Sequence, residues 1–228
     1  MNYVLRNAIL DFANGSDART LVANLEHLRE AYPPQAFHAL MNLLSSHDQA
    51  RALHVLGGSF EATPEVLRKA KQKLRLATLV QMTLPGSPTV YYGDEVGLTG
   101  GDDPYNRMPY PWADQGGQPD MALRQDFQSL LKLRQDKKVL RRGALTAPLL
   151  STQQVVVLAR QWERDFALIA VNNSEQVQTH TFELPAAVRG KEGAVWWGQG
   201  DVKRQGSQMT ITLPPMSGGV WGTNSASK

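Results

Sequence analysis

The order of helices and strands limits what this chain can fold into. Two short apolar runs, residues 39–46 and 88–93, are typical of buried strands. Helices are expected over residues 4–13, 16–32, 63–84 and 121–135. Strands that alternate with helices predict a parallel sheet. A parallel sheet of only two strands leaves its edges uncovered, so either further strands are hidden or the chain is the later part of a larger α/β unit.

The pattern changes near Gly143, where short β-rich runs separated by polar or glycine-containing turns begin. These runs cover residues 154–162, 165–173, 177–184, 193–198 and 208–214. They predict a separate antiparallel sandwich. The expected fold is therefore α/β followed by all-β, with domains at 1–142 and 143–228. Trp196 and Trp197 are neighbours on one expected strand, so one is expected in the core and the other at the contact between the domains.

Composition narrows the choice of partners. The chain has 228 residues, 24 Lys and Arg against 21 Asp and Glu, and a net charge of +3. So small an imbalance gives little support for nucleic acid as a partner. The basic run at 132–143 lies at the end of an expected helix, where cations complement the helix dipole. Neither a signal peptide nor an apolar stretch long enough to span a membrane is present, and the compartment stays open.

The residue types also exclude some chemistry. With no cysteine, the chain has no disulfide, thiolate nucleophile or cysteine-ligated metal. No cofactor motif is identified. The histidines outside the motif described next have no spacing that makes a metal-ligand set; they are His27, His38, His54 and His180.

Two titratable residues, His47 and Asp48, directly follow the first apolar run. An isolated His-Asp pair is more often a satisfied polar pair at a strand end or a helix N-cap than a functional site. Arg51 could face Asp48 or a neighbouring carboxylate, or it could be a solvated helix residue. Asp94 and Glu95 form a second acidic pair, which is a candidate for a catalytic role.

Five segments resemble, in order, the α-amylase family, glycoside hydrolase family 13. "NLLSSHD" at 42–48 is similar to its strand-seven motif, and "GSPTVYYGDEVG" at 86–97 to its strand-eight motif. "GGDDPYNRMPYPW" at 100–112 resembles a loop of the cyclomaltodextrinase, neopullulanase and maltogenic amylase branch. "LLKLRQDKKVLRRGAL" at 130–145 resembles the last barrel helix and its exit, and "MNYVLRNAILDF" at 1–12 the segment after strand six. The resemblance implies the C-terminal part of a (β/α)8 barrel, about strands seven and eight, followed by the β domain.

The resemblance also implies roles for four residues in a retaining enzyme that acts on α-1,4-linked glucans. Asp48 matches the carboxylate that stabilises the transition state, and His47 would donate to a hydroxyl of the same glucose. Asp103 and Arg107 would hold a glucose at the far end of the donor side, Arg107 through its fork of donors. A simple ion pair that stabilises the loop is the alternative for Asp103 and Arg107. For Glu95, in the second acidic pair, the resemblance implies a structural role and not a catalytic one.

Aromatic residues near these motifs could stack on sugar rings. They are Tyr91, Tyr92, Tyr105, Tyr110 and Trp112, of which Tyr91 or Tyr92 is expected to be core. Gln49, Tyr105 and Tyr110 depart from the residues common in the family, which affects the expected substrate choice.

The family's nucleophile and its acid/base precede every segment matched here. We therefore expect the chain to be inactive alone and to belong to an enzyme that acts on maltooligosaccharides, cyclodextrins or pullulan. The preceding part of the barrel or a second copy would then be its partner. One alternative is a non-catalytic carbohydrate-binding or assembly module. Another is an unrelated α/β protein in which the His-Asp pair activates water.

Overall fold

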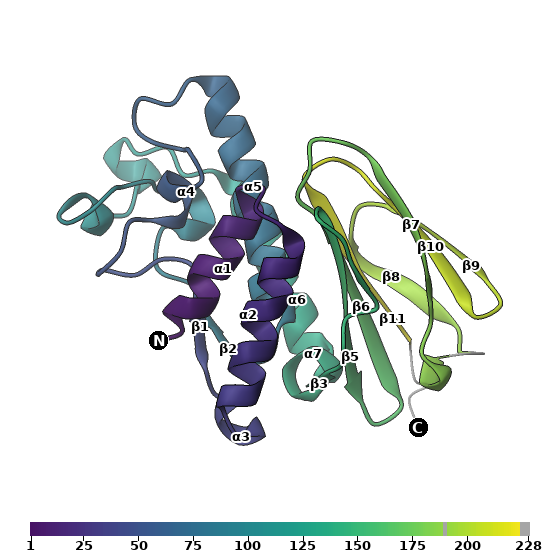
Figure 1. Ribbon diagram of the computed structural model, residues 1–228. Helices are drawn as coiled ribbons and strands as arrows, with labels where there is room; N and C mark the ends of the chain where they lie inside the picture. Colours follow the sequence, from purple (N-terminus) through teal and green to yellow (C-terminus); the bar gives the residue numbers. More distant parts are fainter. Residues whose placement is uncertain (189–190, 224–228) are drawn as a thin grey trace.

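The computed structural model describes residues 1–188 and 191–223, and it is built in three layers (Figure 1). A layer of helices packs against one face of a six-stranded sheet, and a three-stranded sheet covers the other face. The two sheets form the sandwich predicted for the second half of the chain.

The helical layer contains the four predicted helices. They are α1 (Tyr3–Ala13), α2 (Ala18–Ala31), α5 (Pro64–Thr83) and α6 (Met121–Asp136). Shorter turns of helix are α3 (Pro34–Phe37), α4 (Ala52–Val55) and α7 (Lys138–Arg142). The helices start where capping chemistry allows: Asp17 accepts from the backbone of α2, and Thr63 caps α5 just before Pro64.

Two short strands, β1 (Met41–Leu43) and β2 (Ser87–Thr89), pair in parallel, as predicted from the order of elements. Both are shorter than predicted. Burial on both faces was expected for the first run, but Met41 is exposed while Asn42 and Leu43 are buried. Gln81 on α5 donates to the carbonyls of both Asn42 and Thr89, each at 3.0 Å, and so ties the crossover helix to both strands.

The sandwich contains nine strands in two antiparallel sheets within the described residues. The six-stranded sheet consists of β3 (Ala144–Leu145), β4 (Leu150–Ser151), β5 (Val155–Trp162), β6 (Asp165–Asn172), β8 (Gly193–Gly198) and β11 (Ser217–Thr223). The three-stranded sheet consists of β7 (Gln178–Glu183), β9 (Asp201–Gln205) and β10 (Gln208–Leu213). Four of these strands were not predicted: β3, β4, β9 and β11.

The central strands of the six-stranded sheet, β5 and β6, are buried on both faces. Val156, Leu158 and Ile169 face the helices, whereas Val157 and Leu168 face the three-stranded sheet. This explains why β5 and β6 read as unbroken apolar runs instead of alternating ones. Because the helices and the sandwich share this sheet, the division at 142/143 stays a prediction.

Two buried arginines fix the bend between α5 and β2. Arg134 on α6 donates to the carbonyls of Met82, Leu84 and Gly86 at 2.6–3.0 Å. Arg160 on β5 donates to the carbonyls of Thr83 and Gly143. Burial lowers the pKa of Arg160 to about 9 and that of Arg134 to about 10, and each guanidinium is held by backbone carbonyls. Side chains from both parts of the chain therefore position the start of β2.

A β-bulge overturns the prediction for Trp196 and Trp197. In β11 the register shifts between Val220, which pairs with Trp197, and Trp221, which pairs with Val195. The extra residue turns both indoles to the helical side of the sheet. Trp197 Nε1 donates to Ser129 Oγ on α6 at 2.7 Å, which confirms one contact between the two parts. The basic run at 132–143 covers the end of α6 and all of α7, as expected.

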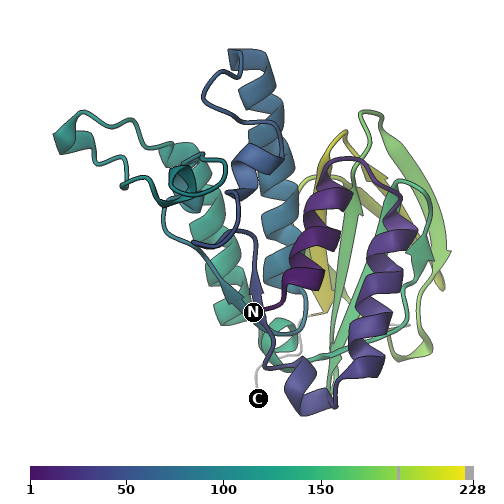
Figure 2. The same ribbon diagram turned by 60° about the vertical axis from the view of Figure 1, so that its left-hand side comes forward.

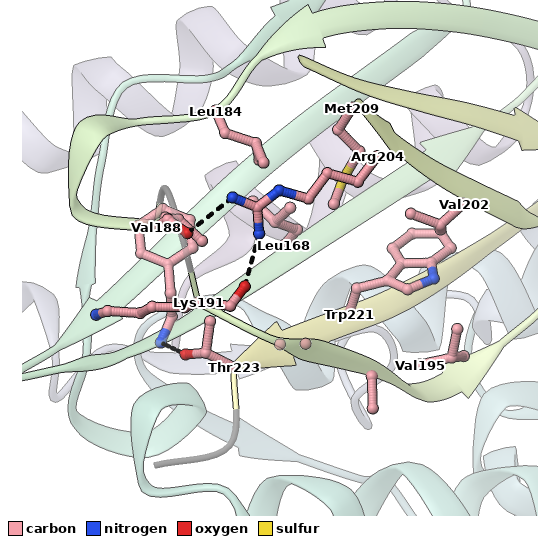
Figure 3. A pocket seen from close by; sticks show the side chains of 14 residues that line it. Leu168, Leu184, Val188, Lys191, Val195, Val202, Arg204, Met209, Trp221 and Thr223 are labelled. Atoms are coloured by element: carbon pink, nitrogen blue, oxygen red, sulfur yellow. Dashed lines mark hydrogen bonds between the residues drawn. The ribbon is translucent and has the colours of Figure 1, made fainter. Parts of the chain in front are cut away.

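The core of the sandwich leaves a cavity of about 240 Å³ (Figure 3). Its walls are mostly apolar and include Leu168, Val202 and Trp221. Arg204 at its rim donates to the backbone carbonyls of Lys191 and Val188, and these hydrogen bonds hold that part of the wall in place.

Candidate functional site

His47 and Asp48 lie in a tight turn directly after β1. An isolated bridge between Ser46 and Gln49 closes this turn, and Ser46 Oγ accepts from the backbone of Asp48 at 3.1 Å. The residues before the turn are buried, whereas His47, Asp48 and Gln49 are exposed. The end of the strand therefore presents two polar side chains to the outside.

The two side chains face each other. His47 Nε2 lies 3.2 Å from Asp48 Oδ1, and the side chains are 56% and 49% exposed. This contact is the satisfied polar pair at a strand end that the non-functional alternative predicts. The exposure nevertheless leaves the second carboxylate oxygen of Asp48 and the outer edge of the imidazole free to meet a ligand.

The turn is held from beneath by α1. Arg6 donates through Nε to the carbonyl of Leu44 at 2.8 Å and through Nη2 to that of Ala50 at 2.7 Å. Tyr3 Oη and Ser46 Oγ share a hydrogen bond of 3.1 Å. These contacts fix both ends of the turn while its exposed centre stays open, which is the arrangement a preorganised binding group needs.

Arg51 faces Asp94 and not Asp48. Its side chain is fully buried, so the solvated alternative is wrong. Arg51 Nη1 donates to the carbonyl of Tyr92 at 2.7 Å and lies 3.4 Å from Asp94 Oδ1. The guanidinium also lies over the rings of Tyr91 and Tyr92, 4.5 and 4.7 Å from their centroids. Arg51 thus joins the segment after β1 to the segment after β2.

Burial raises the pKa of Asp94 to about 7, against the opposing effects of a hydrogen bond with Ser45 and the charge of Arg51. Ser45 Oγ also accepts from the backbone of Ala52 at 2.8 Å. Asp94 therefore lies beneath the candidate site and does not present its carboxylate to the outside.

The loop between β2 and α6 carries the second predicted pair. It contains three short 3₁₀ turns: η1 (Asp94–Val96), η2 (Tyr105–Arg107) and η3 (Ala113–Gln115). Arg107 Nε lies 3.3 Å from Asp103 Oδ1, with side chains 49% and 67% exposed. The predicted ion pair is present, and it is as open to solvent as the His47–Asp48 pair.

Asn106 brings the two pairs together. This buried side chain donates through Nδ2 to the carbonyl of His47 at 3.0 Å and to that of Gln49 at 3.3 Å. A further bond joins the backbone of Arg51 to the carbonyl of Gly100 at 2.9 Å. Sequence reasoning missed the role of Asn106, although the residue lies inside the DPYNR motif.

Exposed aromatic rings lie on the loop that carries the Asp103–Arg107 pair. Tyr105 and Trp112 are 58% and 55% exposed, and the ring of Trp112 lies 4.5 Å from that of Tyr110. Tyr92 Oη donates to the carbonyl of Met108 at 2.9 Å, which ties the loop to the segment directly after β2. Tyr91 packs on Arg51 and is half-buried. Tyr105 and Trp112 are thus the rings most open to a sugar face.

The described part of the chain also answers two simpler questions. Residues 1–188 and 191–223 contain no group of three or more His, Asp or Glu side chains that could hold a metal ion. Among the same residues, no helix has the length and apolar character that a membrane span requires.

Comparison with solved structures identifies the architecture. A debranching enzyme from Nostoc punctiforme superposes with a TM-score of 0.84 at 27% identity, over 98% of this chain and 47% of its own. A cyclomaltodextrinase superposes with a TM-score of 0.81 at 28% identity, over 97% of this chain and 36% of its own. The helices with β1 and β2 are thus part of a (β/α)8 barrel, and the sandwich is the β domain that follows it.

Related sequences agree. An amylopullulanase from Thermoanaerobacterium saccharolyticum is 34% identical over 96% of this chain and 19% of its own length. Neopullulanase 2 from Thermoactinomyces vulgaris is 32% identical over 96% of this chain and 35% of its own length. The chain therefore spans well under half of the relatives it matches. Since the model of the α-amylase catalytic domain also matches residues 1–144, this chain belongs to the α-amylase family, glycoside hydrolase family 13.

Proposed function

We propose that this chain is part of a retaining glycoside hydrolase or transglycosylase that acts on α-1,4-linked glucans. Its relatives include enzymes named amylopullulanase, cyclomaltodextrinase and neopullulanase. Maltooligosaccharides, cyclodextrins and pullulan are therefore the substrates we propose. This chain supplies side chains that bind the sugar at the carboxyl ends of the barrel strands.

The observation that supports this proposal most is the link made by Asn106. It places the exposed His47–Asp48 pair and the loop with the exposed Asp103–Arg107 pair in fixed register. Two open acid–base pairs, flanked by exposed aromatic rings at the carboxyl end of a barrel strand, suit a polyhydroxyl ligand.

Each of the four side chains has a role in this mechanism. Asp48 accepts hydrogen bonds from hydroxyls of the reacting glucose, and its charge stabilises the positive charge that develops on the ring in the oxocarbenium-like transition state. His47 donates to the same sugar and is aligned by Asp48. Arg107 donates to hydroxyls of a more distant glucose, and Asp103 orients its guanidinium.

A retaining mechanism also needs a carboxylate nucleophile and a general acid/base. We propose that both come from earlier strands of a barrel that closes on the free edges of β1 and β2, since each of these strands has one neighbour among the described residues. The partner is then the preceding part of the barrel or a second copy. The 228 residues alone should bind glucans without cleaving them.

The test measures reducing-sugar release from maltohexaose and β-cyclodextrin, together with calorimetric binding of maltohexaose. The chain is compared with Asp48→Asn, Arg107→Gln and Asp11→Asn, the last an exposed carboxylate on α1 that serves as the control. We expect binding without release. The first two variants should weaken binding by roughly tenfold, the effect of losing a charge-assisted hydrogen bond, and the control should not.

The other outcomes are informative. Release that disappears in Asp48→Asn would show that the chain holds its own nucleophile, against our assignment. Binding by a stable dimer that lacks turnover even when the preceding barrel strands are supplied would favour the non-catalytic assembly module. Equal binding by all four proteins would refute the proposed site.

A further inference from the structure

A groove of about 430 Å³ lies between α5, α6 and the edge of the six-stranded sheet. Gln72 and Arg75 form one wall, and Trp197 and Gln199 form the other. The groove continues along α5 into a hollow of about 240 Å³ that shares Gln72 and the 215–216 turn with it. The β domain lies on the side of α5 away from α4 (Figures 1 and 2), so the groove is separate from the His47–Asp48 site.

Trp197 gives this groove a rigid aromatic wall. The β-bulge turns the indole toward the helices, and the hydrogen bond to Ser129 fixes its plane. A preorganised ring loses little conformational entropy when a ligand packs against it. The C–H faces of a pyranose are a suitable partner for such a ring, because a sugar has an apolar face and a polar rim.

The charges along the groove favour a neutral ligand over an anionic one. Arg75 is paired with Asp126 at 2.5 Å, and Lys69 with Glu175 at 3.3 Å. Lys73 Nζ donates to Asn14 Oδ1 at 3.1 Å. Asn14 is neutral, so Lys73 keeps its charge, but a polyanion would have to displace the carboxylates from Arg75 and Lys69. Sugar hydroxyls can donate to the carboxylates and accept from the cations.

Two amides add hydrogen-bonding groups that can still be used. The side chains of Gln72 and Gln199 both line the groove, and neither has a hydrogen-bond partner within residues 1–188 and 191–223. An amide can both donate and accept, which matches a hydroxyl. Met216, where the groove meets the hollow, has a φ of +46°, an uncommon conformation for a residue other than glycine.

We propose that this groove is a second glucan-binding site, which holds a neutral segment of the polysaccharide away from the site at His47 and Asp48. The aromatic wall, the free amides and the paired charges indicate a neutral oligosaccharide. The choice of an α-glucan among such ligands rests on the proposed function. If one polysaccharide molecule is bound in the groove, its other segments have a raised effective concentration near the site at His47 and Asp48.

The experiment titrates maltohexaose into the ¹⁵N-labelled chain and follows two sets of signals. The indole N–H of Trp197, one of five tryptophans and assigned with Trp197→Phe, reports on the groove. The amides of residues 46–50 report on the other site. The double variant Gln72→Ala/Gln199→Ala tests the groove, Asp48→Asn tests the other site, and Gln135→Ala/Gln153→Ala, two exposed glutamines elsewhere, is the matched control.

We expect both sets of signals to shift and saturate. The groove variant should weaken the Trp197 titration by roughly tenfold, as the loss of two hydrogen bonds implies, and should leave the titration at residues 46–50 unchanged. Asp48→Asn should do the reverse, and the control should change neither.

Each other pattern has a definite meaning. Shifts at residues 46–50 without a shift at Trp197 would overturn the groove proposal and leave the proposed function standing. A Trp197 shift alone would support the groove and count against the function proposed for His47 and Asp48. A Trp197 shift with dextran sulfate but not with maltohexaose would show a polyanion site and overturn the inference.

Discussion

At the scale of single residues, the burial of Asp94 predicts how the free energy of unfolding changes with pH. Its carboxyl group is buried beneath the candidate site, and burial raises its pKa from 3.8 to about 7. Between pH 4 and 7 the folded chain keeps a proton on Asp94 that the unfolded chain has released. This group's contribution to the free energy of unfolding therefore falls as the pH rises through that window, by roughly 1.4 kcal/mol per unit of pKa difference at most.

Asp94→Asn isolates this effect, because the amide keeps the shape and cannot ionise. The free energy of unfolding of the wild type, minus that of the variant, should decrease from pH 4 to 7 and level off above pH 7. Urea denaturation at intervals of one pH unit measures the difference. Carboxylates with lowered pKa values, such as Asp17 and Asp120, cancel in the subtraction. Parallel stability profiles for the two proteins would contradict the raised pKa.

At the scale of elements, the loop between β2 and α6 should depend on Asn106. Replacing Asn106 by Ala removes two hydrogen bonds to the His47–Asp48 turn and leaves the part-buried carbonyls of His47 and Gln49 without this donor. Each lost hydrogen bond costs about 0.5–1.5 kcal/mol. We expect faster hydrogen exchange at residues 46–50 and 101–108, and weaker binding of maltohexaose, while the helical circular dichroism stays unchanged.

Asn24→Ala is the matched control for that loop. Asn24 is a partly exposed asparagine on α2 whose Nδ2 donates to the carbonyl of Thr20 within its own helix. This variant should leave exchange in both segments and sugar binding as they are. If Asn106→Ala exchanged no faster than Asn24→Ala, the loop and the turn would be independent, and the main support for a joint site would be lost.

At the scale of the whole molecule, local patterns predicted most elements but few long-range contacts. The helices followed from apolar spacing and caps, and the order of elements predicted the parallel pairing of β1 with β2. Strand β9 was missed because "DVKRQ" has little apolar character, and β11 because three glycines interrupt it. The bulge that aligns Trp196 with Trp197 depends on the register of β8 against β11, which their separate sequences do not reveal.

In the candidate site, too, local motifs were predictable from the sequence and long-range contacts were not. The position of His47 and Asp48 at a strand end, and the Asp103–Arg107 pair, followed from short motifs. The partner of Arg51 did not, because Asp94 lies 43 residues along the chain and nearer acidic candidates were available. Asn106 was overlooked for a related reason. An asparagine in a loop is usually explained by hydrogen bonds within its own turn, and the sequence does not reveal that its carbonyl partners are distant.

The shared six-stranded sheet predicts that the helical part and the sandwich unfold together. Leu158 and Leu168 lie on neighbouring strands of this sheet, both 3% exposed, but Leu158 faces the helices and Leu168 the sandwich interior. Replacing either by Ala should cost about 2–5 kcal/mol. Both variants should lower the midpoint of one common transition, followed by circular dichroism of the helices and by tryptophan fluorescence. If Leu168→Ala shifted the fluorescence transition and left the helical one at its wild-type midpoint, the two parts would be separate folding units. The shared sheet would then be a contact between domains and not a common core.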